Sequence, residues 1–476
     1  MTHLIHASDP YGTGIPDRTQ SDRRLWSRAY RAVSGWRLEY VFLVIALVWG
    51  VVQVFLVPPL QVPDEGDHWF RAWALTDGQF TADRQGKITL PAGFTRMADL
   101  YMRLVEAGLP VSLEGQAGFS SYADLFNSAG PPGTISVASR VRTYGPVGYL
   151  PQALGVGLGR LVGAPPLTCF YMARLANLFA ALALLFLAIR LAPFGKQLFV
   201  LVALLPMTMF ELASVSCDAL TIAGAIFYIA LILAESRRTT LRRVDVGFVL
   251  AASAVLLNVK PGYWALVLLV LLVRPTQLGG RARYAAFVAA NALLVAGAFV
   301  IVFLLTATEV RVQAAGAPQA QIMFILRQPM SFLGILWSNV QNGLGTWTSE
   351  SIGVLGWLRI PLSPVAYVIV LVGGLGFSIG MKEEVSEGHW RRVLLATIGL
   401  VVFLTLAVAL YAFLEPTGSG RVFFQGRYLA PVWLLVLLSI YGLRFSNIRL
   451  GQPFVVGVLL LLMAQNFQTL ISAYHP

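Results

Sequence analysis

Charged residues are scarce in this chain. Asp, Glu, Lys and Arg make up 12% of its 476 residues, and hydrophobic residues make up 57%. A typical soluble domain carries about 25% charged residues, so the composition excludes an ordinary soluble enzyme. The sequence therefore predicts an integral membrane protein of the all-α, polytopic class.

Catalytic and redox motifs are equally scarce. The chain has no Walker A loop and no paired-His zinc motif, so nothing supports ATP hydrolysis or zinc catalysis of that kind. Residues 376–380 read Gly-Phe-Ser-Ile-Gly, but they lie inside an apolar segment rather than at a sharp turn, so triad catalysis is not supported either. Its two cysteines, Cys169 and Cys217, match no metal-binding or redox spacing. Isolated core thiols are favoured over a disulfide between them. His68 has no second His at helical spacing, so we do not expect it to bind a metal.

Basic residues outnumber acidic ones, and the formal net charge is +12. A nucleic-acid partner is not expected, because the arginines cluster in short loops between apolar segments, as the positive-inside rule requires. Residues 1–37 are polar and basic, with no apolar stretch before Tyr40. We therefore expect a multi-pass protein of the lipid bilayer with a cytoplasmic N-terminus and a first helix that acts as a signal anchor.

Apolar segments and loops divide the chain into six regions, with about 11 transmembrane helices in all. The regions are a basic cytoplasmic tail (1–37), the first transmembrane helix (38–57), an extracytoplasmic loop with an acidic motif and amphipathic helices (58–145), transmembrane helices and an interfacial helix (146–306), a second extracytoplasmic region (307–362) and C-terminal transmembrane helices (363–476). One alternative stays open. If segment 146–163 crossed the membrane instead of lying at its outer face, the later loops would be inverted.

The most informative stretch is residues 58–71, Pro-Pro-Leu-Gln-Val-Pro-Asp-Glu-Gly-Asp-His-Trp-Phe-Arg. It follows an apolar run that ends at Val57 and is long enough to cross a bilayer. Its prolines cannot continue the helix. Asp64 and Glu65 thus stand at the membrane surface, where an acidic pair suits a general base or a metal ligand. The alternative is a solvated loop whose prolines merely end the helix.

Further polar residues fall on the same predicted face. Asp218 and Lys260 lie at ends of apolar segments, where ionisable groups are costly and often functional. Arg427 opens an apolar segment and suits a lipid phosphate, which a guanidinium binds through two hydrogen bonds. The alternatives are a helix cap for Asp218, snorkelling for Lys260 and an interfacial anchor for Arg427. The other candidate substrate-binding residues are His68, Arg71, Tyr144, Trp357, Arg359, Gln425 and Tyr428.

Six motifs follow one another along most of the chain. They are the acidic stretch with His68 and Arg71, residues 149–155 with Arg174, residues 205–207 with Ser214, Ser216 and Asp218, residues 258–263, residues 353–358, and residues 425–428 with Pro431. Together they resemble an uncharacterised family of bacterial membrane proteins, domain of unknown function twenty-one forty-two. The resemblance leaves the tail uncovered and implies the bacterial cytoplasmic (inner) membrane.

That family is similar in turn to the GT-C class of multi-span glycosyltransferases. This resemblance implies a GT-C-like helix bundle and a polyprenyl-phosphate-linked sugar as the donor. It implies that Asp64 and Glu65 form the catalytic pair, that Lys260 and Arg427 lie near the donor phosphate, and that Asp218 is a supporting acid. Some members of the class need a divalent metal such as Mg²⁺ or Mn²⁺ and others do not. Nothing in the sequence decides between these two cases.

The charged residues favour transfer from, or onto, a phosphate-linked lipid, and the resemblance implies an enzyme that transfers a sugar from a polyprenyl-phosphate carrier to a cell-envelope glycan or lipid on the extracytoplasmic face. A carboxylate would deprotonate the acceptor hydroxyl, while Lys and Arg would neutralise the departing phosphate. One alternative is a transporter or flippase for lipid-linked saccharides, for which polar residues near mid-membrane and inverted repeats are typical. Another is a non-catalytic partner in polysaccharide assembly.

Overall fold

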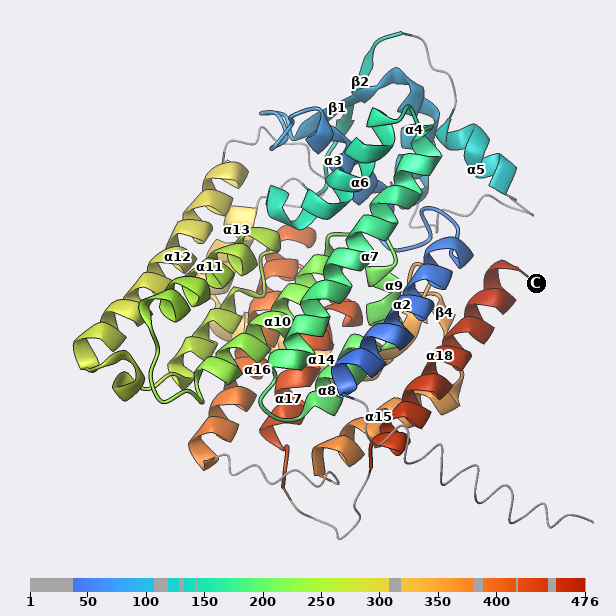
Figure 1. The fold of residues 1–476 in the computed structure, drawn as a ribbon. Coiled ribbons are helices and arrows are strands. Elements are labelled where there is room, and N and C mark those ends of the chain that lie inside the picture. Colours follow the sequence, from blue (N-terminus) through green and yellow to red (C-terminus); the bar gives the residue numbers. More distant parts are fainter. Residues whose placement is uncertain are drawn as a thin grey trace, which may run out of the picture.

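The chain folds into a bundle of helices with a smaller layer of helices and strands across one end (Figure 1). The computed structural model describes residues 37–106, 119–127, 132–141, 144–307, 318–379, 388–416, 418–443 and 451–475. The predicted cytoplasmic tail therefore lies outside the described residues, except for Arg37.

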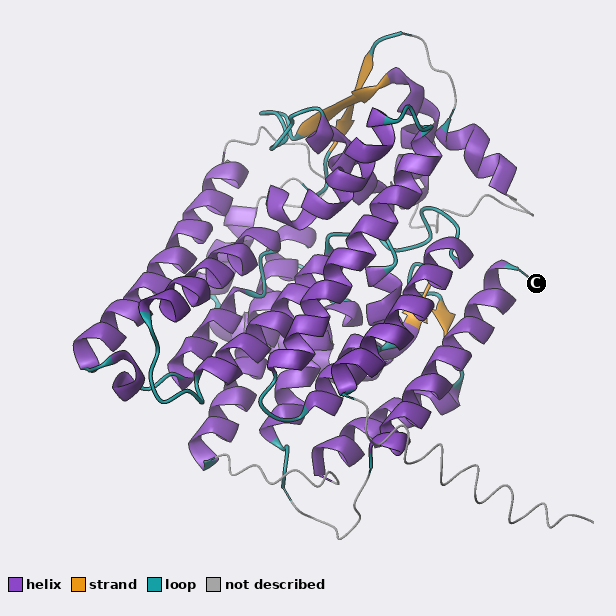
Figure 2. Cartoon of the chain, in the orientation of Figure 1, coloured by secondary structure: helices purple, strands orange, loops and turns teal. Residues whose placement is uncertain are grey.

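Helices account for most of the described chain, and strands are few and short (Figure 2). The α-helices are α2 (Leu38–Leu56), α3 (Glu65–Thr76), α4 (Thr95–Glu106), α5 (Phe119–Phe126), α6 (Leu150–Leu161), α7 (Pro166–Leu191), α8 (Lys196–Ala203), α9 (Pro206–Leu212), α10 (Asp218–Glu235), α11 (Arg243–Val259), α12 (Arg281–Ala307), α13 (Pro318–Arg327), α14 (Pro329–Gly353), α15 (Pro364–Ile379), α16 (His389–Leu414), α17 (Ala430–Ser439) and α18 (Gln452–Tyr474). The 3-10 helices are η1 (Ala92–Phe94), η2 (Pro146–Tyr149), η3 (Trp264–Leu272), η4 (Pro275–Leu278) and η5 (Gly426–Leu429).

The described residues also form two small antiparallel sheets. Strand β1 (Lys87–Pro91) pairs with β2 (Thr134–Ala138), and β3 (Val354–Leu355) pairs with β4 (Ile360–Pro361). The first sheet belongs to the layer across the end of the bundle, where β1 contacts α3. The second forms a tight hairpin in which Gly356, Trp357 and Leu358 all have positive φ.

Six helices in the described part of the chain are long and apolar enough to cross a membrane: α2, α7, α10, α12, α16 and α18. Helices α15 and α17 are apolar but shorter. The predicted all-α membrane fold is thus confirmed, whereas the expected number of about 11 spans stays a prediction. Both cysteines are free and buried, as the sequence favours for two isolated thiols.

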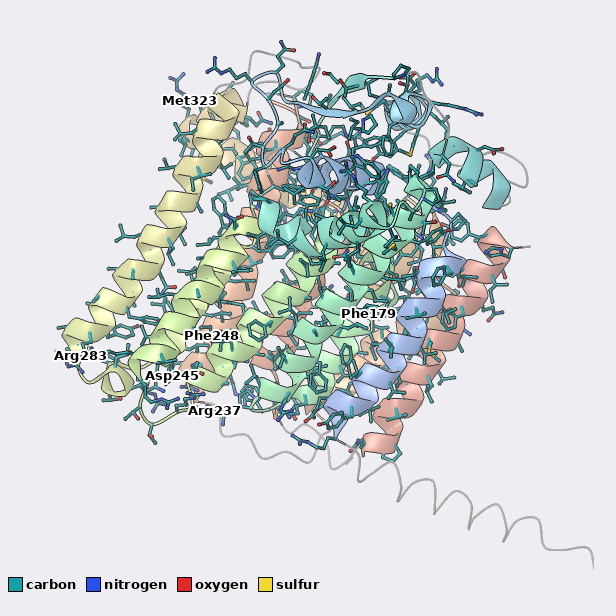
Figure 3. All side chains as sticks on the ribbon, turned by 45° about the horizontal axis from the view of Figure 1, so that its top comes forward. Phe179, Arg237, Asp245, Phe248, Arg283 and Met323 are labelled. Atoms are coloured by element: carbon teal, nitrogen blue, oxygen red, sulfur yellow. The ribbon has the colours of Figure 1, made fainter. Side chains whose placement is uncertain are left out.

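The two ends of the bundle differ in character. Helices α3 to α6 and the β1–β2 sheet lie together at the top of Figure 1, and we call this side the loop end. Arg237, Asp245 and Arg283 lie at the opposite side, far from Met323 (Figure 3). We call that opposite side the basic end. This segregation has the form that the positive-inside rule gives to cytoplasmic loops.

Several helices of the bundle are interrupted or short. Helix α8 stops before Pro206, which opens α9 because its fixed φ suits a first helical turn. Helix α11 ends at Val259, and Gly262 turns the chain with φ +108° into η3. Helix α6 has 12 residues, so it is about 18 Å long and too short to cross the roughly 30 Å hydrocarbon core.

Candidate functional site

Charged side chains converge below the layer at the loop end, at one depth in the bundle. Asp218 begins α10, which has 18 residues and ends at Glu235 near the basic end. A rise of 1.5 Å per residue places Asp218 about 26 Å above that end. Helix α11, with 17 residues between Arg243 and Lys260, gives Lys260 a similar height. The cluster therefore lies near a boundary of the roughly 30 Å hydrocarbon core rather than at its middle.

Asp64 stands at the entrance to this cluster. It is the N-cap residue of α3 and has φ 61°, a left-handed conformation that a non-glycine residue adopts only where its surroundings enforce it. Its Oδ2 accepts a hydrogen bond from Arg427 Nη2 at 2.5 Å, and its Oδ1 lies 3.4 Å from Arg140 Nη2. The side chain is 29% exposed. Asp64 is thus both held by cations and open to a ligand.

The pKa of Asp64 reflects these neighbours. Burial opposes ionisation, but the charges of Arg427, Arg140 and His68 outweigh it and lower the pKa to about 2. Asp64 is therefore a carboxylate at neutral pH, as a base requires.

Glu65 has different surroundings, although it is the next residue. Its two carboxylate oxygens accept from Arg174 Nε and Nη2, both at 2.8 Å, and both side chains are completely buried. The backbone amides of Leu60 and Val215 donate to the same two oxygens, at 2.9 and 3.1 Å. With these four hydrogen bonds Glu65 closes the turn before α3 rather than facing a ligand.

Arg174 also ties the acidic motif to the first transmembrane helix. Its Nη1 donates to the carbonyl oxygens of Val54 and Val57 at 2.9 and 2.7 Å, and its Nη2 donates to that of Pro58 at 3.1 Å. The Val54 carbonyl lies in the last turn of α2, and the carbonyls of Val57 and Pro58 follow directly after the helix. One guanidinium on α7 thus fixes both the end of α2 and the start of α3.

Arg427 is the centre of the cluster. Its Nη2 contacts Asp64, and its Nη1 lies 3.1 Å from Glu211 Oε1 and 3.6 Å from Asp218 Oδ2. Its side chain is 1% exposed. Lys260 Nζ lies 2.6 Å from Asp218 Oδ1, also in a buried pair. Two buried cations are therefore shared among three carboxylates.

Aromatic rings and one amide complete the walls of the cluster. Lys260 Nζ lies 4.1 Å from the ring centre of Tyr428 and 5.2 Å from that of Tyr144, so both rings face a cation. Gln425 Oε1 accepts from Arg427 Nε at 2.7 Å and from the Tyr428 hydroxyl at 3.1 Å. The structure thus brings these predicted residues together from distant parts of the chain.

His68 lies beside this group on α3. Its Nδ1 is 2.8 Å from the Tyr149 hydroxyl, and its ring stacks at 6.3 Å against that of Tyr144. Burial, only partly offset by the carboxylates of Asp218 and Asp64, lowers the pKa of His68 to about 4. The imidazole is therefore neutral at pH 7.

Asp67, one turn after Asp64, carries a raised pKa. Its Oδ2 accepts from the Tyr101 hydroxyl at 2.8 Å and lies 3.2 Å from Arg140 Nε. Burial and the nearby charge of Asp64 outweigh Arg140 and raise the pKa of Asp67 to about 6. Arg140, which is 38% exposed, thus bridges the two aspartates at the mouth of the cluster.

Three predicted substrate-binding residues lie outside this group. Trp357 Nε1 donates to the carbonyl of Leu60 at 3.0 Å, which braces the acidic motif from the β3–β4 hairpin. Arg71 donates to the carbonyls of Gln79 and Phe80 at 2.7 and 2.5 Å and thereby holds the turn after α3. Arg359 lies in the β3–β4 hairpin, where its backbone amide donates to Leu355.

Sequence reasoning did not single out Arg140 or Glu211 as site residues. Arg140 follows β2 in a loop with many polar residues, so nothing in its local pattern distinguishes it. Glu211 is different, because an isolated carboxylate in the otherwise apolar stretch from 198 to 213 is a costly feature and a usable signal.

No group of three or more His, Cys, Asp and Glu side chains among the described residues is placed to hold a metal ion. The three carboxylates around Arg427 already face Arg427 and Lys260, so this donor set does not fit Mg²⁺ or Mn²⁺ as it stands.

Comparisons with known proteins give one result. No curated protein and no solved structure matches the chain. A family model described as "Predicted membrane protein (DUF2142)" matches residues 47–436, a range that contains α3, the Lys260 loop and η5. That range is far more than half of the chain, and the chain therefore belongs to this family of predicted membrane proteins.

Proposed function

We propose that this chain is a membrane-embedded glycosyltransferase of GT-C type. It would transfer a sugar from a polyprenyl-phosphate carrier to a hydroxyl of a cell-envelope glycan or lipid at the extracytoplasmic face. The observation that carries this proposal is Asp64, an ionised, partly exposed carboxylate held in a left-handed conformation at the mouth of a buried charge cluster. Strained, charged residues in such a place are typical of functional sites.

Asp64 would act as the general base. The acceptor oxygen attacks the anomeric carbon, the bond from that carbon to the phosphate oxygen breaks, and its electron pair leaves with the phosphate. The hydroxyl proton passes to Asp64 as the new bond forms. A low pKa is compatible with this role, because a hydroxyl becomes strongly acidic once its oxygen bonds to the sugar. An anionic donor beside Arg140 would also weaken the cationic field that lowers the pKa of Asp64.

Arg140 is the cation best placed to face the phosphate. It lies next to Asp64 and is 38% exposed, whereas Lys260 and Arg427 are buried and already neutralise Glu211 and Asp218. We therefore give the last two a supporting role, in which they hold Asp64 in position. Glu65, which is buried against Arg174, would likewise position the motif rather than take the proton.

The test uses purified protein in nanodiscs and a panel of polyprenyl-phosphate sugars, with release of free lipid phosphate as the readout. Replacement Asp64→Asn should lower turnover at least about a hundredfold, the usual contribution of a general base. Replacement Asp124→Asn is the matched control, because this exposed aspartate lies on α5, away from the cluster. Turnover that survives in Asp64→Asn would remove Asp64 as the base.

A flippase for lipid-linked saccharides is the second candidate, and one observation favours it. The segments α8–α9 and α11–η3 are both interrupted, and each carries a buried charge, Glu211 on α9 and Lys260 at the end of α11, as in many transporters. The depth of the cluster near a membrane boundary counts against it, because transporter sites lie near the midplane. Transbilayer movement of a fluorescent lipid-linked saccharide in proteoliposomes, without release of lipid phosphate, would select this candidate.

A further inference from the structure

A second polar site lies on the outside of the bundle, away from the charge cluster. It is a groove of about 600 Å³ between the start of α15, strand β4 and the last third of α18. The residues that line it are Ile360, Ser363, Val365, Gln465, Gln468, Thr469, Ser472 and Ala473. We propose that this groove binds the neutral, hydroxyl-rich headgroup of a membrane glycolipid.

The lining of the groove is rich in polar side chains and uncharged. Its polar members are carboxamides and hydroxyls, which both donate and accept hydrogen bonds, and none of the lining residues is charged. Such a set matches sugar hydroxyls, whereas a phosphate would call for Arg, Lys or backbone amides. Ser363 Oγ donates to Gln465 Oε1 at 2.5 Å, so one wall of the groove is fixed by a bond between α15 and α18.

Most of these polar residues lie on one face of α18. Gln465, Gln468, Thr469 and Ser472 recur at the spacing of one helix face on α18, which is long and apolar enough to span a membrane. Counted from Gln452 at 1.5 Å per residue, they lie about 20–30 Å along the helix. They therefore reach the same boundary of the hydrocarbon core as the charge cluster, which is the level of lipid headgroups.

The rest of the exposed surface of α18 decides between a lipid and a partner helix. Nearer the basic end it exposes Phe454, Leu460 and Leu461, which suit lipid tails. Membrane helices associate through close packing of small residues and through hydrogen bonds between polar side chains. Here the polar contacts are confined to the headgroup level, while Val365 at the rim is 60% exposed and offers an apolar surface to the lipid tails.

The groove also adjoins the acidic motif through the β3–β4 hairpin. Ile360 of β4 lines the groove, and three residues earlier Trp357 donates to the Leu60 carbonyl. A bound headgroup would therefore contact the same hairpin that braces the acidic motif. The proposal does not depend on glycosyl transfer, because it concerns binding alone.

The test measures equilibrium binding of a fluorescent diglycosyl diacylglycerol to the full chain in nanodiscs, with phosphatidylglycerol and a free disaccharide as competitors. Replacement Gln468→Leu should weaken binding about fivefold, the effect of one lost hydrogen bond. Replacement Ala473→Trp should weaken it more, because an indole would fill the groove. Replacement Leu461→Ala, on the lipid-facing surface of the same helix, should leave binding unchanged.

Each alternative gives a different result. Equal binding by Gln468→Leu, Ala473→Trp and the unchanged chain would overturn the site. Equal competition by phosphatidylglycerol would overturn the preference for a neutral headgroup. Full competition by the free disaccharide would overturn the claim that the ligand is a lipid. If both variants instead convert a dimer into a monomer by mass, the groove is an interface between chains and the proposal fails.

Discussion

Asp64 and Glu65 are adjacent in sequence, yet their surroundings separate their roles. Asp64 keeps 29% of its side chain exposed between Arg427 and Arg140, whereas Glu65 is fully buried in four hydrogen bonds. The left-handed φ of Asp64 turns the chain between them, so that one carboxylate faces the mouth of the cluster and the other faces Arg174. The two residues should therefore respond differently to removal of their charge.

Replacement Glu65→Gln should destabilise the fold. It would leave the buried guanidinium of Arg174 without its counter-charge, at a cost of about 3–5 kcal/mol. Thermal unfolding in detergent should show a large fall in melting temperature for Glu65→Gln and only a small change for Asp64→Asn. If Glu65→Gln melts normally and loses only turnover, Glu65 is itself a catalytic residue.

Replacement Asp67→Asn should stabilise the protein above neutral pH. The pKa of Asp67 is raised in the fold from its usual 3.8 to about 6, so the folded state binds this proton more tightly than the unfolded state. Stability from this group is therefore greatest in acid and is lost as the pH rises towards 6. Asn cannot ionise and avoids that loss, which is on the order of 3 kcal/mol.

Melting curves at two pH values check this expectation. Asp67→Asn should melt higher than the unchanged protein at pH 7.5 and close to it at pH 4. A variant that melts lower at pH 7.5 would show that the pair of Asp67 with Arg140 stabilises the fold more than burial of the carboxylate costs.

At the scale of elements, the cluster depends on how closely η5 approaches α14. Gly426 lies against the backbone of α14, where a Cβ would meet the carbonyl oxygen of Trp347 and lie 2.8 Å from the amide nitrogen of Ser351. Its own amide donates to Glu350 Oε2 at 2.7 Å. A glycine here lets η5 pack tightly enough for the next residue, Arg427, to reach Asp64.

Replacement Gly426→Ala should therefore push η5 away from α14 and move Arg427. We expect a loss of about 1–3 kcal/mol in stability, as for overpacked cores, together with reduced turnover. Gly420→Ala is the control, because a Cβ at that position meets nothing within 4 Å. Equal melting temperatures for the two variants would contradict this account of η5.

The sequence predicts some of these elements well and others poorly. Prolines after Val57 and the sequence Lys260-Pro261-Gly262 mark breaks that the structure contains, because proline and glycine act through local sterics. The interruption between α8 and α9 is marked only by Pro206, because the apolar stretch from 198 to 213 continues on both sides of it. The helical form of 329–353 is also hidden, because α14 lies beside η5 and α9 through contacts that no periodicity encodes.

The same limit applies to the candidate site. Charged residues at the ends of apolar segments, such as Asp218 and Lys260, are visible because charge is costly there. Their pairing is a matter of tertiary structure: Arg427 meets Asp64 across 363 positions of sequence. Which carboxylate stays exposed, and which cation stands at the mouth, follows from packing alone, so Arg140 is found only in the folded chain.

At the scale of the whole molecule, the basic end and the loop end should face opposite sides of the membrane. Arg237 and Arg283 gather at the basic end, which the positive-inside rule places in the cytoplasm. The described cysteines are buried, so a single introduced thiol reports its own position.

Thr240→Cys at the basic end and Gln85→Cys at the loop end would place exposed thiols on the two sides. A membrane-impermeant maleimide added to intact cells should label Gln85→Cys at once and Thr240→Cys only after lysis. The reverse pattern would show that the molecule has the opposite orientation in the membrane, with the proposed reaction at the cytoplasmic face.

The acidic motif pairs with two arginines, Arg174 and Arg427, that lie far from it in the sequence, and this has a consequence for biosynthesis. The acidic motif leaves the ribosome early, but Arg174 follows Glu65 by 109 residues and Arg427 follows Asp64 by 363. While the chain is being inserted into the membrane, the motif therefore has no arginine partner until α7 has been made, and it lacks the second partner until η5 has been made. The charge cluster closes only when nearly the whole polypeptide has been made, so a stalled or truncated chain would carry every acidic residue of the motif without the arginine that completes the cluster.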